Sequence, residues 1–398
     1  MTRRIVSDVA IVGGGLIGCW AALFLRRRGR GVVLLEKGEI GAQSSGQNFG
    51  NLRIQGRHVS EFPLALRAAG QWEQLADLIG DNCGFTQTGH LYVARDTEQE
   101  RKLGQIAAEA NVNGLAVELL DRAALRRRWP CFGVTVVAGC WSTRDATANP
   151  RRVTPATARA AAELDAELLP GTRVIGVTHV GGRFIVETDR GVSVECKVLV
   201  NAAGAWGGDI AAAFGQSAPL FVAGPPQFVT DPQPHLLEPS VQAADGSVIF
   251  RQTVRGNVIV AGYPRTATDR ERPYAPVPPG KTLAAMGALA GMVPALAQAA
   301  VIRVWSGTEG YLPDMLPVLG PSRAVPGLFH AFGFSGHGFQ LGPGVGLVLS
   351  ELIVDGCSPT PLPGFGIERF EGSVEPDEKF RREFDAHRPA GSPSEAGS

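Results

Sequence analysis

The chain has 398 residues, of which 44% are hydrophobic, and its 38 basic residues balance 38 acidic ones to a formal net charge of zero. This balance excludes the strongly basic composition typical of proteins that bind nucleic acid or anionic membranes, and we expect neither partner. Because the length exceeds what one hydrophobic core normally holds, we expect two domains.

A glycine motif follows the first predicted strand. The strand is the apolar run Val9–Val12, and an apolar helix pattern begins at Leu16 and continues through Ile17 to Leu25. The motif has the spacing G-x-G-x-x-G and consists of Gly13, Gly15 and Gly18. Its first glycine permits a tight turn, its second lets the backbone approach a pyrophosphate, and its third lets helix and strand pack closely. The pyrophosphate binds at the helix N-terminus, where free N–H groups and the helix dipole favour an anion.

An acidic residue ends the second predicted strand. The stretch GVVLLEKG contains Glu36, which lies 18 residues after Gly18 and is followed by Lys37. A carboxylate at this place accepts hydrogen bonds from ribose hydroxyls and selects against a 2′-phosphate. Strand, motif, helix, strand and acid in this order predict a dinucleotide-binding Rossmann unit. The alternative is a glycine-rich turn that binds no ligand.

The six cysteines are scattered, without a C-x-x-C pair or a neighbouring set of histidines. We therefore expect reduced thiols in a cytoplasmic protein and no metal site. The uncharged stretch Leu283–Val301 has an adequate length for a membrane span, but it consists mostly of Ala and Gly and is interrupted by Pro294. We expect a surface-packed helix pair there and no membrane span.

The rest of the chain alternates between helical patterns and extended segments. Helical patterns cover residues 58–79 and 97–128, with a strand-like run at Thr88–Arg95 between them. Further strands are predicted near Arg173–Val180, Arg183–Thr188 and Val194–Val200. The runs SVIFRQTV and GNVIVAGYP alternate in the manner of antiparallel strands, and the segment that begins GLFHAFGFSGHGFQ repeats the order strand, glycine-rich turn, apolar helix.

These elements predict an α/β protein in which a Rossmann-like cofactor-binding domain is interleaved with an α+β substrate domain built on an antiparallel sheet. The cofactor-binding segments are predicted at 1–82, 149–219 and 311–370. The substrate-domain segments are predicted at 83–148 and 220–310, and a charged and disordered tail at 371–398.

Four motifs in order resemble the D-amino-acid oxidase-like flavoprotein superfamily. They are IVGGGLIG with LLEKG, SSGQNFGN, VLVNAAGAW, and the pair WSGTEGYLPDMLPVLG and GFSGHGFQLGP, and the resemblance covers most of residues 5–357. The superfamily includes glycine oxidase, sarcosine oxidase, D-amino-acid dehydrogenases and the β subunits of opine and hydroxyproline dehydrogenases. The resemblance implies FAD as the dinucleotide, so the expected fold has a Rossmann-like FAD-binding domain.

The resemblance also implies a reaction. Such enzymes transfer a hydride from the carbon next to an amine nitrogen to flavin N5 and form an imine, and a side-chain base is not obligatory. The expected substrate is a D-amino acid, an N-alkyl glycine, a hydroxyproline or an opine, and we expect dehydrogenase rather than fast oxidase behaviour. Two alternatives stay open: a non-amine substrate such as a hydroxy acid, and a flavin-bearing electron-transfer subunit of a hetero-oligomeric dehydrogenase. Partner subunits or an electron carrier are therefore expected partners.

Three regions are expected to contact the flavin on the basis of the resemblance. The loop after the second strand contributes Ser44, Ser45, Gly46, Asn48, Gly50, Asn51 and Leu52, unless it is an ordinary polar loop. The middle region contributes Val174, Ala202, Ala203, Gly204 and Trp206. The C-terminal region contributes Gly307, Gly336, His337, Gly338, Phe339 and Gln340. A helix that begins near Leu341 would point its N-terminus at the ring, and Gln340 stands where sarcosine-oxidase-like members often have a lysine. His337 taken alone would usually be a structural histidine with satisfied hydrogen bonds.

Four residues are catalytic or substrate-binding candidates: Arg53, His337, Glu309 and Arg251. Glu309 stands where glycine-oxidase-like members carry the arginine that binds the substrate carboxylate, and a carboxylate there repels another anion. The carboxylate is then expected to bind Arg53 or Arg251, unless the substrate has none at this point. Arg53 could equally face the flavin or pair on the surface. If Glu309 lines the pocket it attracts a cationic group; otherwise it pairs with an arginine such as Arg303.

The mode of flavin attachment is also predicted from the resemblance. Some sarcosine oxidases bind the flavin covalently through a cysteine shortly before the PD of this region. The corresponding stretch WSGTEGYLPD contains no cysteine. We therefore expect non-covalent FAD.

Overall fold

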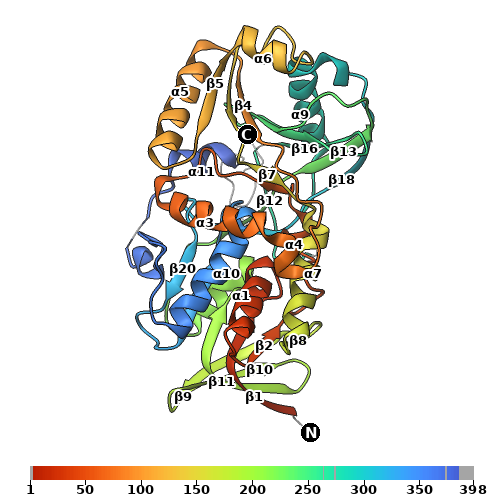
Figure 1. Cartoon of the computed structure of the whole chain (residues 1–398). Coiled ribbons are helices and arrows are strands. Elements are labelled where there is room, and N and C mark those ends of the chain that lie inside the picture. Colours follow the sequence, from red (N-terminus) through yellow and green to blue (C-terminus); the bar gives the residue numbers. More distant parts are fainter. Residues whose placement is uncertain (1–2, 263, 273–274, 373, 385–398) are drawn as a thin grey trace, which may run out of the picture.

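Two eight-stranded sheets and the helices packed on them make up most of the computed structural model, which describes residues 3–262, 264–272, 275–372 and 374–384 (Figure 1). The first sheet lies in the lower half of Figure 1 and the second in the upper half. The chain leaves the first sheet after β2 (Val32–Leu35), returns at β8 (Glu167–Leu169), leaves again after β11 (Val192–Asn201) and returns at β20 (Val318–Pro321).

The first sheet has a parallel core in the order β21–β11–β1–β2–β8. The remaining bounds are β1 (Arg3–Val12), β21 (Leu328–Phe332), β9 (Val174–Val180) and β10 (Arg183–Thr188). The last four residues of β1, Val9–Val12, and all of β2 are buried, and their side chains form continuous apolar runs. Such runs are typical of parallel strands that are covered on both faces. The predicted Rossmann-like α/β architecture is confirmed.

Helices cover this sheet. They are α1 (Leu16–Arg27), α3 (Phe62–Glu73), α4 (Leu75–Ile79), α7 (Pro150–Glu163) and α10 (Gly338–Val354). Helix α1 packs between α7 and α10, and α10 also packs on α3 (Figure 1). The approach of α10 to α1 requires a glycine, because a Cβ at Gly346 would lie 2.6 Å from the carbonyl carbon of Trp20.

The second sheet has the order β18–β13–β16–β15–β14–β4–β6–β5. Its strands are β4 (His90–Ala94), β5 (Val117–Asp121), β6 (Ala138–Ser142), β13 (Gln227–Pro232), β14 (Ser240–Ala243), β15 (Val248–Gln252), β16 (Asn257–Gly262) and β18 (Val301–Trp305). It is antiparallel as predicted, except that β14 and β4 are parallel.

Two predicted helical regions differ from the structure. Residues 97–128 contain α5 (Thr97–Val112) and α6 (Arg122–Arg128), but β5 lies between them. This edge strand forms by pairing with β6, a tertiary contact that the local helical pattern does not contain. The predicted helix pair at 283–301 is one helix, α9 (Pro279–Met292), and a single 3₁₀ turn at Pro294–Leu296, because Val301 already begins β18. No helix in the described ranges is long and apolar enough to cross a membrane.

Two small sheets lie between the large ones. One has the order β17–β12–β19 and the other pairs β3 with β7. Their strands are β3 (Asn51–Leu52), β7 (Ala146–Thr147), β12 (Phe221–Gly224), β17 (Thr266–Ala267) and β19 (Glu309–Tyr311). A short helix, α8 (Gly207–Ala212), follows β11.

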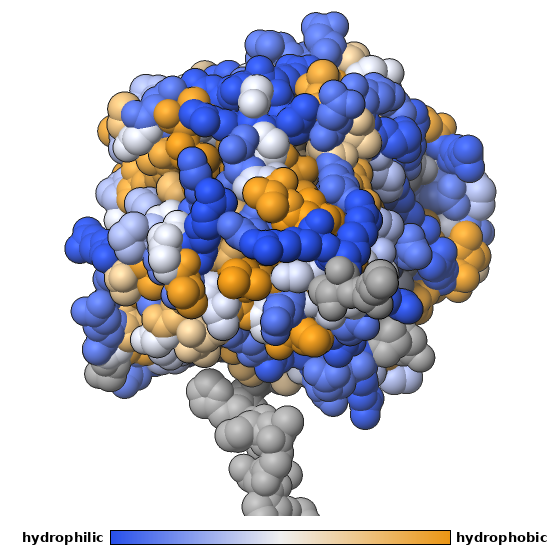
Figure 2. Space-filling model, turned by 90° about the horizontal axis from the view of Figure 1, so that it is seen from below, coloured by the Kyte–Doolittle hydropathy of each residue, from blue (hydrophilic) through white to orange (hydrophobic). Residues whose placement is uncertain are grey.

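The C-terminal segment is more ordered than predicted. Residues Glu378–Glu383 form helix α11, which Figure 1 shows between α5 and α3. Phe380 and Phe384 are buried in a cluster with Tyr311 and Met315, so the expectation of a disordered tail does not hold for this helix. The tail residues 385–398 lie outside the described residues. At the lower end of the molecule, Figure 2 shows small hydrophobic groups within a mainly hydrophilic face, which is ordinary for a protein surface.

Candidate functional site

A cavity of about 630 Å³ opens at the carboxyl ends of the parallel strands. Val12 ends β1, Leu35 ends β2, and Ala202 and Gly333 follow β11 and β21; all four line the cavity. Ligands of open α/β sheets bind at this edge, because the loops after successive strands diverge there. The cavity therefore occupies the place where the glycine motif predicts a dinucleotide.

The glycine turn packs so closely that side chains are excluded. Gly13 has φ +114°, and a Cβ on it would lie 2.3 Å from the carbonyl oxygen of Ala202. A Cβ on Gly18 would lie 2.0 Å from the carbonyl oxygen of Gly13. Helix α1 begins directly after the turn, its N-cap residue Gly15 has no side chain to cap it, and its first turn contains no acidic residue. Gly15, which precedes the helix, lines the cavity, so the positive end of α1 faces it and favours an anion.

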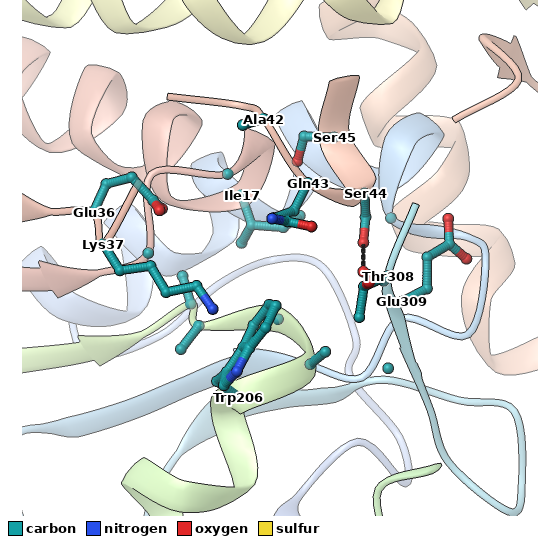
Figure 3. Close-up of a pocket in the computed structure, with 18 of the residues that line it drawn as sticks. Ile17, Glu36, Lys37, Ala42, Gln43, Ser44, Ser45, Trp206, Thr308 and Glu309 are labelled. Atoms are coloured by element: carbon teal, nitrogen blue, oxygen red, sulfur yellow. Dashed lines mark hydrogen bonds between the residues drawn. The ribbon is translucent and has the colours of Figure 1, made fainter. Parts of the chain in front are cut away.

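Glu36 is fixed at the end of β2. Its Oε2 accepts a hydrogen bond of 2.7 Å from the Gly14 N–H, and its Oε1 accepts one of 2.8 Å from the Gly38 N–H. Each carboxylate oxygen retains a lone pair that can accept a hydroxyl. Lys37 extends over the Trp206 ring, with Nζ 2.9 Å from the ring centroid (Figure 3), and burial lowers its pKa to about 8. Glu36, Lys37 and Trp206 all line this cavity.

The predicted polar loop begins with one helical turn, α2 (Ser44–Gln47). Ser45 Oγ accepts a hydrogen bond of 2.8 Å from the Leu16 N–H, and Ser44 Oγ donates one of 2.5 Å to the Thr308 carbonyl oxygen (Figure 3). The two serines thus connect the start of α1 with the chain that enters β19. Their place between these elements brings Glu309 to the far end of the cavity from Lys37 (Figure 3).

A second helix also directs its N-terminus at the cavity. Helix α10 begins at Gly338, three residues before the predicted start near Leu341, and Gly338 and Phe339 line the cavity. The helix has no side-chain cap and no acidic residue in its first turn. Its positive end stabilises negative charge on a group bound beside it. The cavity therefore has one helix N-terminus suited to a phosphate and another suited to an electron-accepting ring.

A second cavity of about 280 Å³ adjoins the first. Both are lined by Asn48, Glu309, Gly336 and Phe339, which mark the junction. The charged residues of the second cavity are Arg53, Arg57, Lys102, Arg265, Lys379, Arg382, Glu109, Glu309 and Glu383. Basic residues outnumber acidic ones two to one, so this cavity favours an anionic ligand.

A buried network forms one wall of the second cavity. His337 Nδ1 lies 2.9 Å from Glu61 Oε1, and His337 Nε2 lies 3.0 Å from Lys379 Nζ. Burial lowers the pKa of His337 to about 3, so the ring is neutral, donates from Nδ1 and accepts at Nε2. Arg57 Nη1 is 3.9 Å from Glu61 Oε1 and is buried without a hydrogen-bond partner among the described residues.

Glu309 lies at the junction and not on the surface. The Tyr311 hydroxyl donates a hydrogen bond to Glu309 Oε2, and burial raises the pKa of the carboxyl. Arg303 instead lies over the Trp305 ring, 6.0 Å from its centroid, and the described ion pairs do not join it to Glu309. The sequence left open an ion pair between Glu309 and Arg303. In the structure Glu309 instead contacts Tyr311 of the same strand, β19.

The two candidate arginines have different positions. Arg53 lines the second cavity, and its carbonyl oxygen accepts a hydrogen bond of 3.0 Å from Arg57 Nε. Arg251 does not line either described cavity: its Nε donates to the Phe49 carbonyl oxygen at 3.0 Å, and its guanidinium covers the Phe49 ring. Arg251 therefore supports the loop, and the expectation that it binds a substrate carboxylate is not met by this geometry.

Most of the predicted cofactor residues line the first cavity. They are Gly13, Gly15, Leu16, Ile17, Glu36, Lys37, Ser44, Ser45, Asn48, Val174, Ala202, Ala203, Gly204, Trp206, Gly336, Gly338 and Phe339. Three others line the second cavity instead, namely Gly50, Asn51 and His337. The remainder, Gly18, Gly46, Leu52, Gly307 and Gln340, line neither.

These remaining residues have packing roles. A Cβ on Gly46 would lie 2.5 Å from the Gly41 carbonyl oxygen, and one on Gly307 would lie 2.8 Å from Gln47 Cβ. Gln340 faces α3, where its Nε2 donates a hydrogen bond of 2.8 Å to the Ala65 carbonyl oxygen. Its amide therefore holds α10 to α3.

Sequence reasoning predicted Arg53 but missed the other five basic residues of the second cavity, among them Arg57 and Lys379. Arg57 has a local signal, since it precedes Glu61 by four residues at the start of a helical pattern. Lys379 has none, because it lies in the segment assigned to the tail and meets His337 only through the tertiary fold.

Comparison with known proteins was consistent with this geometry. Residues 8–352 match the family model described as DAO, FAD dependent oxidoreductase. The chain is 27% identical to hydrogen cyanide synthase subunit HcnC of Pseudomonas aeruginosa, across 92% of this chain and 96% of that protein. It is 28% identical to glycine oxidase of Geobacillus kaustophilus, across 94% of this chain and 99% of that protein.

A solved structure of similar fold is L-proline dehydrogenase from P. horikoshii, with a TM-score of 0.85 and 26% identity over 92% of this chain and 98% of that chain. Other relatives are longer. This chain spans 45% of 4-methylaminobutanoate oxidase (formaldehyde-forming) of Paenarthrobacter nicotinovorans, at 27% identity over 91% of this chain. Helix α11 follows the last residue of the family match.

The first cavity fits FAD. The close glycine turn and the positive end of α1 suit the pyrophosphate, and the Glu36 carboxylate suits the adenosine ribose. The uncapped start of α10 suits the flavin ring, on which negative charge develops during reduction. The residues present therefore agree with the cofactor that the family implies.

We predict that Glu36→Ala weakens FAD binding about 10- to 100-fold, because hydrogen bonds from the ribose to a charged acceptor are lost. Glu39→Ala is the matched control, since Glu39 is exposed at the mouth of the same cavity and carries the same charge. The dissociation constant is measured by flavin fluorescence quenching on apoprotein. Equal losses in both variants would mean that Glu36 acts only through its charge.

Proposed function

The chain belongs to the family of FAD dependent oxidoreductases, and from this premise we propose that it oxidises the C–N bond of a carboxylate-bearing amino acid or secondary amine to an imine. The observation that carries the proposal is the basic second cavity, which meets the first cavity at Glu309. FAD, when bound, supplies the electron acceptor. The chain's residues bind the substrate, orient it and exclude water.

Arg57 is the proposed partner of the substrate carboxylate. Its side chain is buried, lines the second cavity and has an Nη1 without a hydrogen-bond partner in the described structure. A buried donor that lacks a partner costs free energy, and a carboxylate that binds it removes this cost. Arg53 lies on the same cavity and adds a second positive charge. Glycine-oxidase-like members have a carboxylate-binding arginine at the position of Glu309, and Arg57 and Arg53 are proposed to take over its role in this chain.

Glu309 is the proposed partner of the substrate amine. It lines both cavities, so a nitrogen beside it lies at their junction. Its carboxylate accepts hydrogen bonds and attracts positive charge on the amine. A substrate held by Arg57 and Glu309 spans the second cavity and presents its C–N bond toward the first. This orientation is the contribution to catalysis that we assign to the protein.

We propose that electrons pass from this chain to a partner subunit or an electron carrier. The supporting observation is the similarity to a protein that is named as a synthase subunit. The alternative role is that of a flavin-bearing subunit that only transfers electrons and oxidises no substrate itself. Reduction of the flavin by an amine in the isolated chain would contradict this alternative.

The substrate class is tested by anaerobic bleaching of the flavin in the purified chain. We predict that at least one D-amino acid, N-alkyl glycine, hydroxyproline or opine reduces the flavin at a rate at least about 10-fold higher than the hydroxy acid of the same carbon skeleton. Admission of air separates oxidase from dehydrogenase behaviour. Reduction by hydroxy acids alone, or by no compound in the panel, would contradict the proposed function.

Dissociable FAD is a further prediction. In the described part of the chain no cysteine lines the first cavity, and Cys19, which lies near the turn, is buried beneath it with Sγ 3.6 Å from the Gly14 carbonyl oxygen. Acid precipitation of the holoprotein is therefore expected to leave yellow FAD in the supernatant. Flavin fluorescence that migrates with the protein on a denaturing gel would show a covalent bond.

Another prediction concerns Glu309→Gln. Loss of the charge is expected to raise KM for the oxidised amine about 10-fold, which corresponds to ~1.4 kcal/mol of binding free energy. Glu109→Gln is the control, because Glu109 lines the second cavity from α5 and is exposed. Its KM is expected to change less than about 2-fold. Equal changes in both variants would refute a specific contact between Glu309 and the amine.

A further inference from the structure

Helix α11 lies beyond the residues of the family match and forms part of the second cavity. Its start is capped by Asp377, whose carboxylate accepts a hydrogen bond of 2.6 Å from the Phe380 N–H. Its end is held by a backbone hydrogen bond of 2.8 Å from the Arg265 N–H to the Glu383 carbonyl oxygen. Since Phe380 and Phe384 are buried as well, α11 has a defined position against the cavity.

Three charged residues of α11 share one face and line the cavity. They are Lys379, Arg382 and Glu383, at helical positions i, i+3 and i+4. Glu383 is already paired with Arg265. Arg382 is exposed at the outer end. Lys379 is therefore the half-buried cation that this helix adds.

The charge of Lys379 is not neutralised by a direct partner. Its Nζ donates to His337 Nε2 at 3.0 Å, and that ring is neutral. The ion pairs among the described residues give Lys379 no carboxylate partner. An ammonium keeps further N–H donors after one hydrogen bond, so Lys379 can bind an acidic group in the cavity.

Lys379 and Arg57 are separate cations on one wall. Glu61 and His337 lie between them, since Arg57 Nη1 is near Glu61 Oε1 and Lys379 Nζ is bonded to the opposite nitrogen of His337. One carboxylate bound to Arg57 leaves the positive charge of Lys379 unmatched. A ligand with a second acidic group would match both charges.

We propose that Lys379 binds a second acidic group of the substrate, so that the preferred substrate is an amine with two carboxylates, such as an N-carboxyalkyl amino acid or an acidic amino acid. This inference rests on the proposed function, because it names the substrate class of the same site. Lys379 is then a specificity-determining residue supplied by the segment after the family match.

The test compares diacids with their monoamides. Isothermal titration measures the binding of succinate, glutarate and their monoamides to the FAD-loaded protein, and needs no turnover. In the wild type at least one diacid is expected to bind about 10-fold or more tightly than its monoamide. Lys379→Met is expected to abolish this preference and to change monoamide binding less than about 2-fold, whereas Lys379→Arg retains part of it.

Arg381→Met is the matched control. Arg381 lies on the same short helix, but its side chain is exposed and pairs with Glu375. The diacid preference is expected to survive this substitution. An unchanged preference in Lys379→Met, an equal loss for diacid and monoamide, or a wild type without any preference would overturn the inference. The last two outcomes would assign Lys379 a purely structural contact with His337.

The pH dependence of binding gives an independent readout. Burial, with the nearby arginines, lowers the pKa of Lys379 to about 8. The charged and titratable groups that face it are His337, Glu61, Arg53, Arg57, Arg265 and Glu383. Lys379 loses its proton as the pH rises through about 8. The affinity for diacids is therefore expected to fall between about pH 7 and about pH 9. Lys379→Met is expected to remove this slope, and persistence of the slope would overturn the inference.

The two proposals fail in different measurements. Flavin reduction by amines decides the proposed function, and the ratio of diacid to monoamide binding decides the role of Lys379. Oxidation of monoacid and diacid amines at equal kcat/KM would support the proposed function and overturn the inference.

Discussion

The turn between β1 and α1 leaves no room for side chains, and the position of both cavities depends on this packing. The backbone of Gly13 lies against the end of β11, and Gly18 lies against Gly13. The start of α1 is therefore held at the carboxyl edge of the sheet, with its positive end toward the first cavity. The second cavity begins where the first ends, at Glu309 and Phe339.

The source of positive charge differs between the two cavities. In the first, two helix N-termini supply partial positive charge beside the side chains of Glu36 and Lys37, which suits a phosphate-bearing cofactor. In the second, whole charges are buried, and each needs a partner. Burial opposes ionisation of Glu61, yet His337, Arg57 and Lys379 outweigh it and lower the pKa of this carboxyl to about 2. Glu61 thus stabilises the cations that are proposed to face the substrate.

The second cavity is assembled from distant parts of the chain. Arg57 precedes α3, Lys102 lies on α5, Glu309 begins β19 and Lys379 lies on α11. The small sheets and α11 connect these parts between the two large sheets (Figure 1). Because none of its lining residues belongs to the glycine turn at residues 13–18, this cavity can change in charge and shape while that turn is retained.

The sequence by itself determined the cofactor half of the protein. This half depends on local features: the close packing at Gly13 and Gly18, the buried apolar strands and the carboxylate of Glu36. All of them can be recognised within a stretch of about thirty residues. Tertiary structure alone decided which residues form the second cavity. Arg251 supports a loop, and Lys379 joins the cavity from a predicted tail, because side-chain direction and long-range pairing depend on contacts between segments far apart in the sequence.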